Sequence, residues 1–234
     1  MSNMSFLKKI YYEKYSKKSY SISNVDLVID RIFRHQKKGT YVDVGCNHPI
    51  KYNNTYLLYK RGWRGINVDL DERSINDFNK IRPEDCNIKA LISDKVQLKN
   101  VFIYHSRSAI NTVSEGLVNS RKNKPKQKII MKSTTLNNLL IDYKSRIRNN
   151  IDLLSIDIEN HEFEALKNFN FKKNKIKIIV IEHLNTKMKK LETQNQSLAD
   201  ITKSKIYKLL VKNRFKLINW VNSDLIFSNT LLKF

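Results

Sequence analysis

Short apolar runs rich in β-branched residues alternate with amphipathic segments along most of this chain, and that alternation constrains the fold more than any other feature. The runs typical of strands are 40–45, 65–70, 86–92, 100–104, 151–157, 176–182, 215–221 and 224–229. The segments expected to form helices are 25–33, 54–62, 74–81, 136–143, 161–169 and 206–213. Strands alternating with helices predict an α/β fold, a mostly parallel sheet with helices on both faces. Asn222 and Ser223 separate the last two strands, which predicts a hairpin with antiparallel character.

The length of 234 residues and the 41% hydrophobic content suit one large α/β domain. We take residues 1–22 as a basic N-terminal arm and residues 23–234 as the domain, with Ser23 or Asn24 as the N-cap of its first helix. The sequence shows no apolar run of about 18 residues and no secretory signal. Cys46 and Cys86 form no C-x-x-C pair, so we expect no disulfide scaffold, no cysteine-ligated zinc and a cytoplasmic location.

The formal net charge of +22 is the most extreme compositional value. A field of that size attracts polyanions and anionic surfaces. Two interpretations stay open, because the excess is mostly lysine scattered along the chain, as an AT-rich genome would encode. It is either a compositional background or a selected polyanion-binding surface. The charged run at 121–128 is likewise either a solvated loop or a substrate lid.

The first strand ends in a turn with a single glycine, Gly45, followed by Cys46, Asn47, His48 and Pro49. A dinucleotide fingerprint needs three glycines, because the pyrophosphate must approach backbone amides closely. Cys46 follows Gly45 directly with a Cβ that would hinder such an approach, and a proline offers no amide donor. The turn therefore supports neither NAD nor ATP. An adenosine ligand without phosphates needs one close approach, which Gly45 can supply.

An acidic residue, Asp69, ends the second strand 24 residues after Gly45. Its carboxylate can accept hydrogen bonds from both ribose hydroxyls, although it can also cap the following helix. Asp43 can reach an ammonium group, directly or through water. A phosphate-free adenosine that carries an ammonium group describes S-adenosylmethionine.

At this point two stretches, residues 41–72 and residues 151–182, resemble the FkbM-type methyltransferases. The similarity covers roughly residues 38–183. It implies a Rossmann-like class I methyltransferase fold, with a seven-stranded sheet whose last strand is antiparallel, and O-methylation of hydroxyls, often on sugars or glycans. By resemblance the cofactor contacts are Asp43, Gly45 and Asn47 in the turn, Asp69 at the ribose, Leu70 at the adenine, and Leu91 and Ser93 bordering the base. His48 lies beside this turn, facing the cofactor or the acceptor or capping the helix start.

The chain departs from the family pattern in two places. Asn160 follows Glu159 where the family usually has a glycine, which can alter a tight turn. Residues 95–132 match nothing in the family, and we expect this region to lie on the substrate side.

Acidic residues and a histidine follow the fourth and fifth strands of the predicted sheet. They are Asp157, Glu159, His161 and Glu182. Removing the proton of a hydroxyl acceptor requires a base or a metal ion near the methyl group. By its ordinary pKa His161 is the natural base, with Asp157 or Glu159 orienting it; a solvent-facing helix residue is the alternative. Asp157, Glu159 and Glu182 are also reasonable ligands for a divalent ion, although their spacing does not establish one.

Three functions remain in competition. The first is S-adenosylmethionine-dependent O-methylation of a sugar or glycan hydroxyl. The second is RNA ribose 2′-O-methylation, motivated by the charge, in which Asp157 and Glu182 would work with two lysines that we cannot assign. The third is a noncatalytic basic module that binds nucleic acid or a membrane surface, against which the set of Asp43, Gly45 and Asp69 argues.

Overall fold

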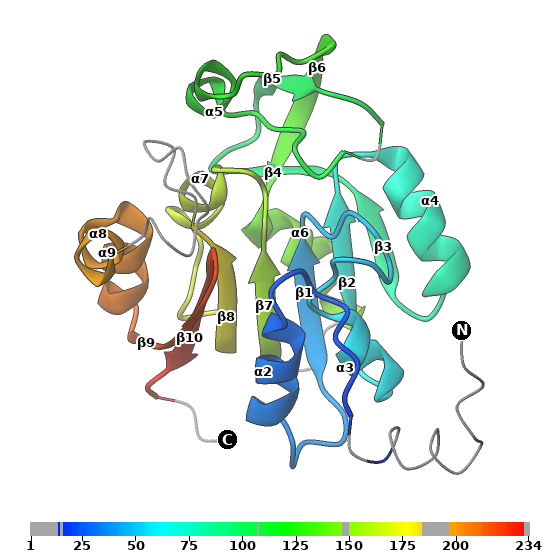
Figure 1. The fold of residues 1–234 in the computed structure, drawn as a ribbon, viewed down its shortest axis with the longest axis vertical. Helices are drawn as coiled ribbons and strands as arrows, with labels where there is room; N and C mark the ends of the chain where they lie inside the picture. Colours follow the sequence, from blue (N-terminus) through cyan, green and yellow to red (C-terminus); the bar gives the residue numbers. More distant parts are fainter. Residues whose placement is uncertain (1–13, 15, 107, 147–149, 184–196, 232–234) are drawn as a thin grey trace, which may run out of the picture.

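The computed structural model describes residues 14, 16–106, 108–146, 150–183 and 197–231, which form a seven-stranded sheet and a three-stranded one (Figure 1). The main sheet has the order β3-β2-β1-β7-β8-β10-β9. Its strands are β1 (Thr40–Val44), β2 (Arg64–Asp69), β3 (Cys86–Lys89), β7 (Ile151–Ile156), β8 (Ile176–Glu182), β9 (Phe215–Val221) and β10 (Asp224–Asn229). The pairs among β3, β2, β1, β7 and β8 are parallel, and β10 is antiparallel to both β8 and β9. The predicted fold class is therefore confirmed.

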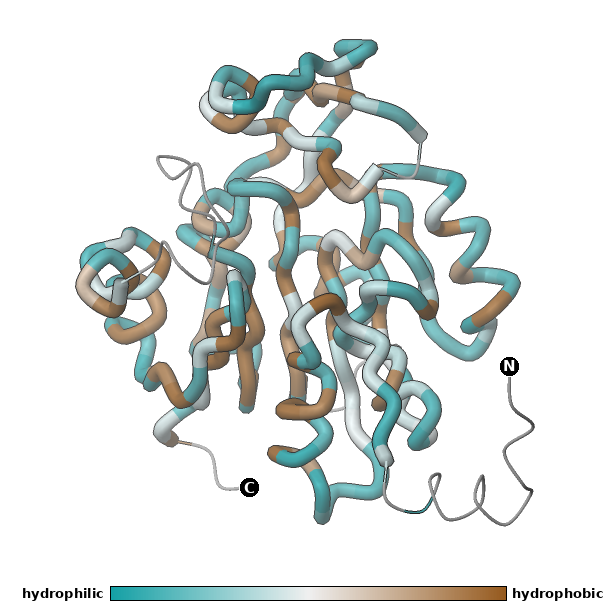
Figure 2. Tube along the Cα trace, viewed as in Figure 1, coloured by the Kyte–Doolittle hydropathy of each residue, from teal (hydrophilic) through white to brown (hydrophobic). Residues whose placement is uncertain are grey.

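Helices cover both faces of the main sheet, because successive residues of its strands point to opposite sides. Val42 and Leu154 pack in one core with α6 (Leu136–Asp142), α7 (Glu162–Leu166), α8 (Leu198–Lys203) and α9 (Lys205–Lys212). Tyr41 and Leu153 pack in a second core with α2 (Val25–Ile32) and α3 (Tyr56–Lys60). Figure 2 shows the hydrophobic residues concentrated along the central strands.

The helix starts follow local side-chain chemistry. Asp71 caps α4 (Glu72–Ile81) by accepting from the amide of Arg73, and Thr135 caps α6 by accepting from the amide of Asn138. Asn24, one of the two predicted caps of α2, is at the N-cap position, but it has φ 61° and makes no side-chain cap bond. The amide of Asp26 instead donates to the Ser21 hydroxyl at 3.2 Å. A short 3-10 turn, η1 (Lys144–Arg146), follows α6.

The second sheet contains β4 (Leu91–Ser93), β5 (Leu98–Ile103) and β6 (Gln127–Thr135), with α5 (Glu115–Ser120) between the last two. It corrects two expectations. The third strand does not run through residue 92, since it ends at Lys89 and β4 pairs with β6 instead. The run at 121–128 is a connection only to residue 126, because β6 begins at Gln127. Figure 1 shows this sheet standing above the carboxyl ends of the main strands.

Much of the predicted N-terminal arm, residues 1–13 and 15, lies outside the described residues. The described remainder is bonded to the domain: the carbonyl of Tyr20 accepts from the amide of Asn53 at 3.1 Å, and its amide donates to Asp26 at 2.7 Å. Among the described helices, none is long and apolar enough to cross a membrane.

Candidate active site

A pocket with an empty volume of about 590 Å³, its open mouth included, lies at the carboxyl ends of β1, β2 and β7. Residues 108–113, which connect β5 to α5, close its other side. The lining residues are Val44, Gly45, Asn47, Val68, Asp69, Leu70, Ala90, Leu91, Ile92, Ser108, Ala109, Asn111, Thr112, Val113, Asp157, Ile158, Glu159 and His161.

The packing of the protein itself requires a glycine at position 45. Gly45 has φ +81°, and a Cβ there would lie 1.8 Å from the carbonyl oxygen of Asp157. The amide of Asp157 in turn donates to the carbonyl of Val44 at 2.9 Å. The close approach that the sequence assigned to a ligand is thus an approach between the ends of β1 and β7. It brings Asp157 against the turn.

Asp69 is half-buried and lines the pocket. Its carboxylate accepts from the amides of Asn47 at 2.9 Å and Asp71 at 2.8 Å. Burial raises the pKa of Asp69 to about 6, against the lowering effect of these two amides. Since Asp71 caps α4, Asp69 is not the N-cap of that helix, and it remains an acceptor on the pocket wall.

Two predicted cofactor residues point elsewhere. Asp43 does not line the pocket; it is buried and accepts from the Thr55 hydroxyl at 2.8 Å and the Asn53 side-chain amide at 3.2 Å. Burial raises the pKa of Asp43, while the charge of Arg82 lowers it. His48 is exposed and its Nδ1 accepts from the amides of residues 50 and 51, so it acts as a cap of this loop.

A sealed polar network beneath the turn escaped the sequence analysis. Arg82 is fully buried and pairs with Asp85 at 2.8 Å. It also donates to the hydroxyls of Tyr41 at 2.6 Å and Thr55 at 3.1 Å. Buried charges of this kind are costly unless every partner is in place. The network therefore fixes the segment 53–55 on which Asp43 also depends. A lone arginine before Pro83 carries no pattern that could reveal this role.

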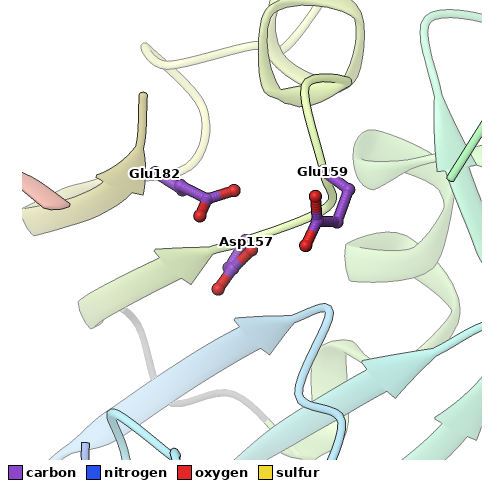
Figure 3. A group of neighbouring side chains, drawn as sticks. All are labelled: Asp157, Glu159 and Glu182. Atoms are coloured by element: carbon purple, nitrogen blue, oxygen red, sulfur yellow. The ribbon is translucent and has the colours of Figure 1, made fainter. Parts of the chain in front are cut away.

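The predicted catalytic carboxylates converge. One oxygen each of Asp157, Glu159 and Glu182 lies within 4.8 Å of the others, at the ends of β7 and β8 (Figure 3). One oxygen of Glu182, Oε2, is buried without a hydrogen-bond partner in the described part of the chain. Glu182 does not line the pocket, whereas Asp157 and Glu159 do.

The close approach of these carboxylates raises their pKa values. Burial, together with the charges of Glu159 and Asp224, raises the pKa of Asp157 well above its ordinary value. The Asp157 side chain is exposed to solvent, so desolvation raises its pKa less than it would raise that of a fully buried carboxylate. The nearby negative charges therefore account for the direction of the pKa shift. Burial and the Asp157 charge likewise raise the pKa of Glu182 well above the ordinary value. The pair is suited to hold one proton between them.

Glu159 joins the cluster to residues 108–121. Its carboxylate pairs with Arg121, and its carbonyl accepts from the Thr112 hydroxyl at 2.8 Å. Arg121 also donates to the carbonyl of Ile110 at 2.6 Å. The residue that replaces the family glycine, Asn160, has φ 68°, a conformation that asparagine tolerates better than other side chains. The tight turn is therefore kept.

His161 lies at the start of α7, buried in the pocket wall. Its Nε2 is 3.1 Å from the Ser93 hydroxyl. Burial, with the charge of Lys99, lowers the pKa of His161 to about 4, so the ordinary pKa that made it the natural base does not apply. Leu91 lines the pocket as predicted, and so does Leu70, but Ser93 lies behind His161 instead of on the wall.

The sheet order, the antiparallel β10 and a pocket at the carboxyl edge define a class I methyltransferase fold. The methyltransferase FkbM domain matches residues 43–209, and the chain belongs to that family.

Two solved structures are similar over nearly the whole chain. A TehB-like SAM-dependent methyltransferase from Corynebacterium glutamicum is 12% identical, with a TM-score of 0.43, over 96% of this chain and 95% of its own. A protein described as a type 11 methyltransferase from Sulfolobus solfataricus is 12% identical, with a TM-score of 0.40, over 89% and 94%. No curated protein gives a significant match.

Proposed function

We propose that this protein is an S-adenosylmethionine-dependent O-methyltransferase whose acceptor is a hydroxyl of a sugar or glycan. The observation that carries the proposal is the position of Asp157, a carboxylate of raised pKa, in the same pocket as Asp69 and against the Gly45 turn. Since the sequence holds only two cysteines, we expect it to work in the cytoplasm.

The pocket fits S-adenosylmethionine better than a nucleoside phosphate. Asp69 offers a carboxylate to the ribose hydroxyls, and Val68, Leu70 and Leu91 offer apolar contact to the adenine. No Lys or Arg is among the described residues that line the pocket, so a phosphate would find no cation there. When bound, this cofactor supplies an electrophilic methyl group on a sulfonium.

Asp157 is the proposed base. Raising the pKa of a carboxylate makes it a stronger proton acceptor near neutral pH. When the acceptor oxygen takes the methyl group and the bond between that carbon and the sulfonium sulfur breaks, leaving a thioether, the hydroxyl proton would pass to Asp157, and Glu182 would share it. Glu159, held by Arg121, is placed to orient the acceptor hydroxyl. His161 acts here as a neutral wall residue.

A divalent ion is the second way to use the same carboxylates. Asp157, Glu159 and Glu182 present oxygen ligands of the kind that Mg²⁺ and Mn²⁺ take, and the ion would replace the shared proton. Loss of turnover with EDTA, restored by Mg²⁺ or Mn²⁺, would support the ion. Turnover that EDTA does not change would mean that the three carboxylates share a proton and hold no divalent ion.

RNA ribose 2′-O-methylation is less well supported. The lysines that this chemistry requires beside Asp157 and Glu182 do not occur among the described residues that line the pocket. The acceptor screen should therefore begin with sugars and continue with capped RNA.

The deciding measurement is calorimetry of the purified protein with S-adenosylmethionine and, in parallel, with ATP and NAD. Tight binding of S-adenosylmethionine alone would support the cofactor. A folded sample that fails to bind it would overturn the enzyme and favour the noncatalytic basic module, which should bind RNA with strong salt dependence and no turnover.

A further inference from the structure

The second sheet presents an outer face that combines exposed aliphatic side chains with lysines. The register pairs Leu98 with Lys132 and Phe102 with Lys128, and residues directly opposite each other share one face. Ile130 lies between the two lysines on the same face. Leu98 is 71% exposed and Ile130 is 68% exposed, and both lysines are exposed as well. We call these four residues, Leu98, Lys128, Ile130 and Lys132, the Leu98–Ile130 face.

Charge is concentrated in this region beyond the composition of the chain. Residues 95–132 contain nine Lys and Arg against one acid, Glu115, whereas the whole chain contains 44 against 22. Lys122, Lys124 and Lys126 are exposed on the connection to β6. Figure 2 shows hydrophilic residues along that part of the second sheet. A compositional background would give about two basic residues for each acid here, so the excess is local.

The two exposed aliphatic side chains, Leu98 and Ile130, distinguish between a nucleic acid and a lipid surface as the anionic partner. A single-stranded nucleic acid is bound by aromatic side chains that stack on its bases, but Phe102 and Tyr104 of this region are buried. Exposed aliphatic side chains flanked by lysines are what a peripheral protein inserts into a headgroup layer while its cations meet lipid phosphates. Arg107 lies outside the described residues and enters only the count of charges taken from the sequence.

We propose that the Leu98–Ile130 face docks on an anionic lipid surface, with Leu98 and Ile130 entering the headgroup region and Lys128 and Lys132 contacting lipid phosphates. The same excursion from the main sheet supplies residues 108–113 of the pocket wall. Docking would therefore hold the pocket near the membrane. A pocket held near the membrane suits a lipid-linked glycan as the acceptor. This corollary rests on the proposed function, whereas the docking itself does not.

The test is sedimentation of the full chain with phosphatidylglycerol-containing vesicles and with pure phosphatidylcholine vesicles. The wild type should sediment only with the anionic vesicles. The double variant Lys128→Gln/Lys132→Gln should bind about 25-fold more weakly, at about fivefold for each lysine. Leu98→Ser/Ile130→Ser should weaken binding about tenfold or more, with an unchanged thermal midpoint that shows the fold is intact.

Matched controls lie elsewhere on the molecule. Lys172→Gln/Lys173→Gln removes two exposed lysines, and Ile141→Ser/Ile218→Ser removes two exposed aliphatic side chains, at 55% and 45% exposure. Both should bind like the wild type. The proposal is overturned if the wild type ignores anionic vesicles, if the controls lose as much as the test variants, or if only removal of residues 1–13 abolishes binding. A dimer that Leu98→Ser/Ile130→Ser converts to a monomer, with no vesicle binding, would instead assign this face to self-association.

Discussion

The carboxylates on the two sides of the pocket have opposite surroundings. At the β1–β2 side every described carboxylate has donors: Asp43 accepts from Thr55 and Asn53, and Asp69 accepts from two backbone amides. At the β7–β8 side Asp157 and Glu182 crowd each other, and Glu182 Oε2 is buried without a partner in the described chain. The first side is built as a rigid receptor. The second stores unfavourable charge that a proton, an ion or a substrate can relieve.

The stability of the receptor side should depend most on Arg82. Arg82→Met leaves Asp85 buried without its cation, and we expect a loss of about 3–5 kcal/mol in the free energy of unfolding, measured by urea denaturation. Lys89→Met, which breaks the exposed pair with Glu72, is the control and should change stability little. A loss of less than about 1 kcal/mol for Arg82→Met would show that the network is not needed.

Turnover should depend most on Asp157. Asp157→Asn removes the proposed base and should lower the rate about 100-fold or more, with S-adenosylmethionine affinity largely kept. Glu164→Gln, a change on α7 outside the pocket lining, is the matched control. Wild-type rates for Asp157→Asn in an assay with the acceptor found by the sugar screen would remove this residue from the mechanism.

Cofactor affinity should depend on Asp69. Asp69→Ala should weaken S-adenosylmethionine binding about tenfold or more in calorimetry, since it removes a charged acceptor. The pKa of about 6 adds a pH test, because protonation removes an acceptor: wild-type affinity should fall below pH 6, by up to about tenfold per unit. Glu72→Gln should keep this pH dependence and Asp69→Ala should lose it. An equal affinity at pH 5 and pH 7 for the wild type would refute the ribose assignment.

The smallest expected effect is that of Glu182→Gln on thermal stability, and this substitution should stabilise the protein. Since the pKa of Glu182 is raised in the folded state, its contribution to stability is complete below the ordinary glutamate pKa and is lost as the pH rises through the folded value. Glu182→Gln should therefore raise the thermal midpoint at pH 8, by about 2–4 °C for a gain of roughly 1 kcal/mol, and leave it unchanged at pH 4. Glu115→Gln serves as an exposed control. A lower midpoint for Glu182→Gln at pH 8 in EDTA would show that the crowding is not unfavourable.

Sequence reasoning was most accurate for strands that lie between clear turn residues. β8, β9 and β10 have the predicted bounds, although β8 is almost wholly buried and β9 is mostly half-buried or exposed. It missed the second sheet as a unit. β6 is largely exposed and interleaves lysines with its apolar residues, so no continuous apolar run marks it. Its partner β4 ends about 34 residues before β6 begins, a separation that local patterns do not report.

The sequence by itself determined the alternation that builds the sheet, the glycine turn, the acid at the end of the second strand and the family. Those features are local, and residue type with short spacing is enough to recognise them. Only the tertiary structure decided that Asp43 and His48 turn away from the pocket, that Arg121 holds Glu159, and that Asp157 raises the pKa of its neighbour Glu182. Charge interactions depend on distances of a few ångströms between residues far apart in the chain, and spacing along the sequence does not contain those distances.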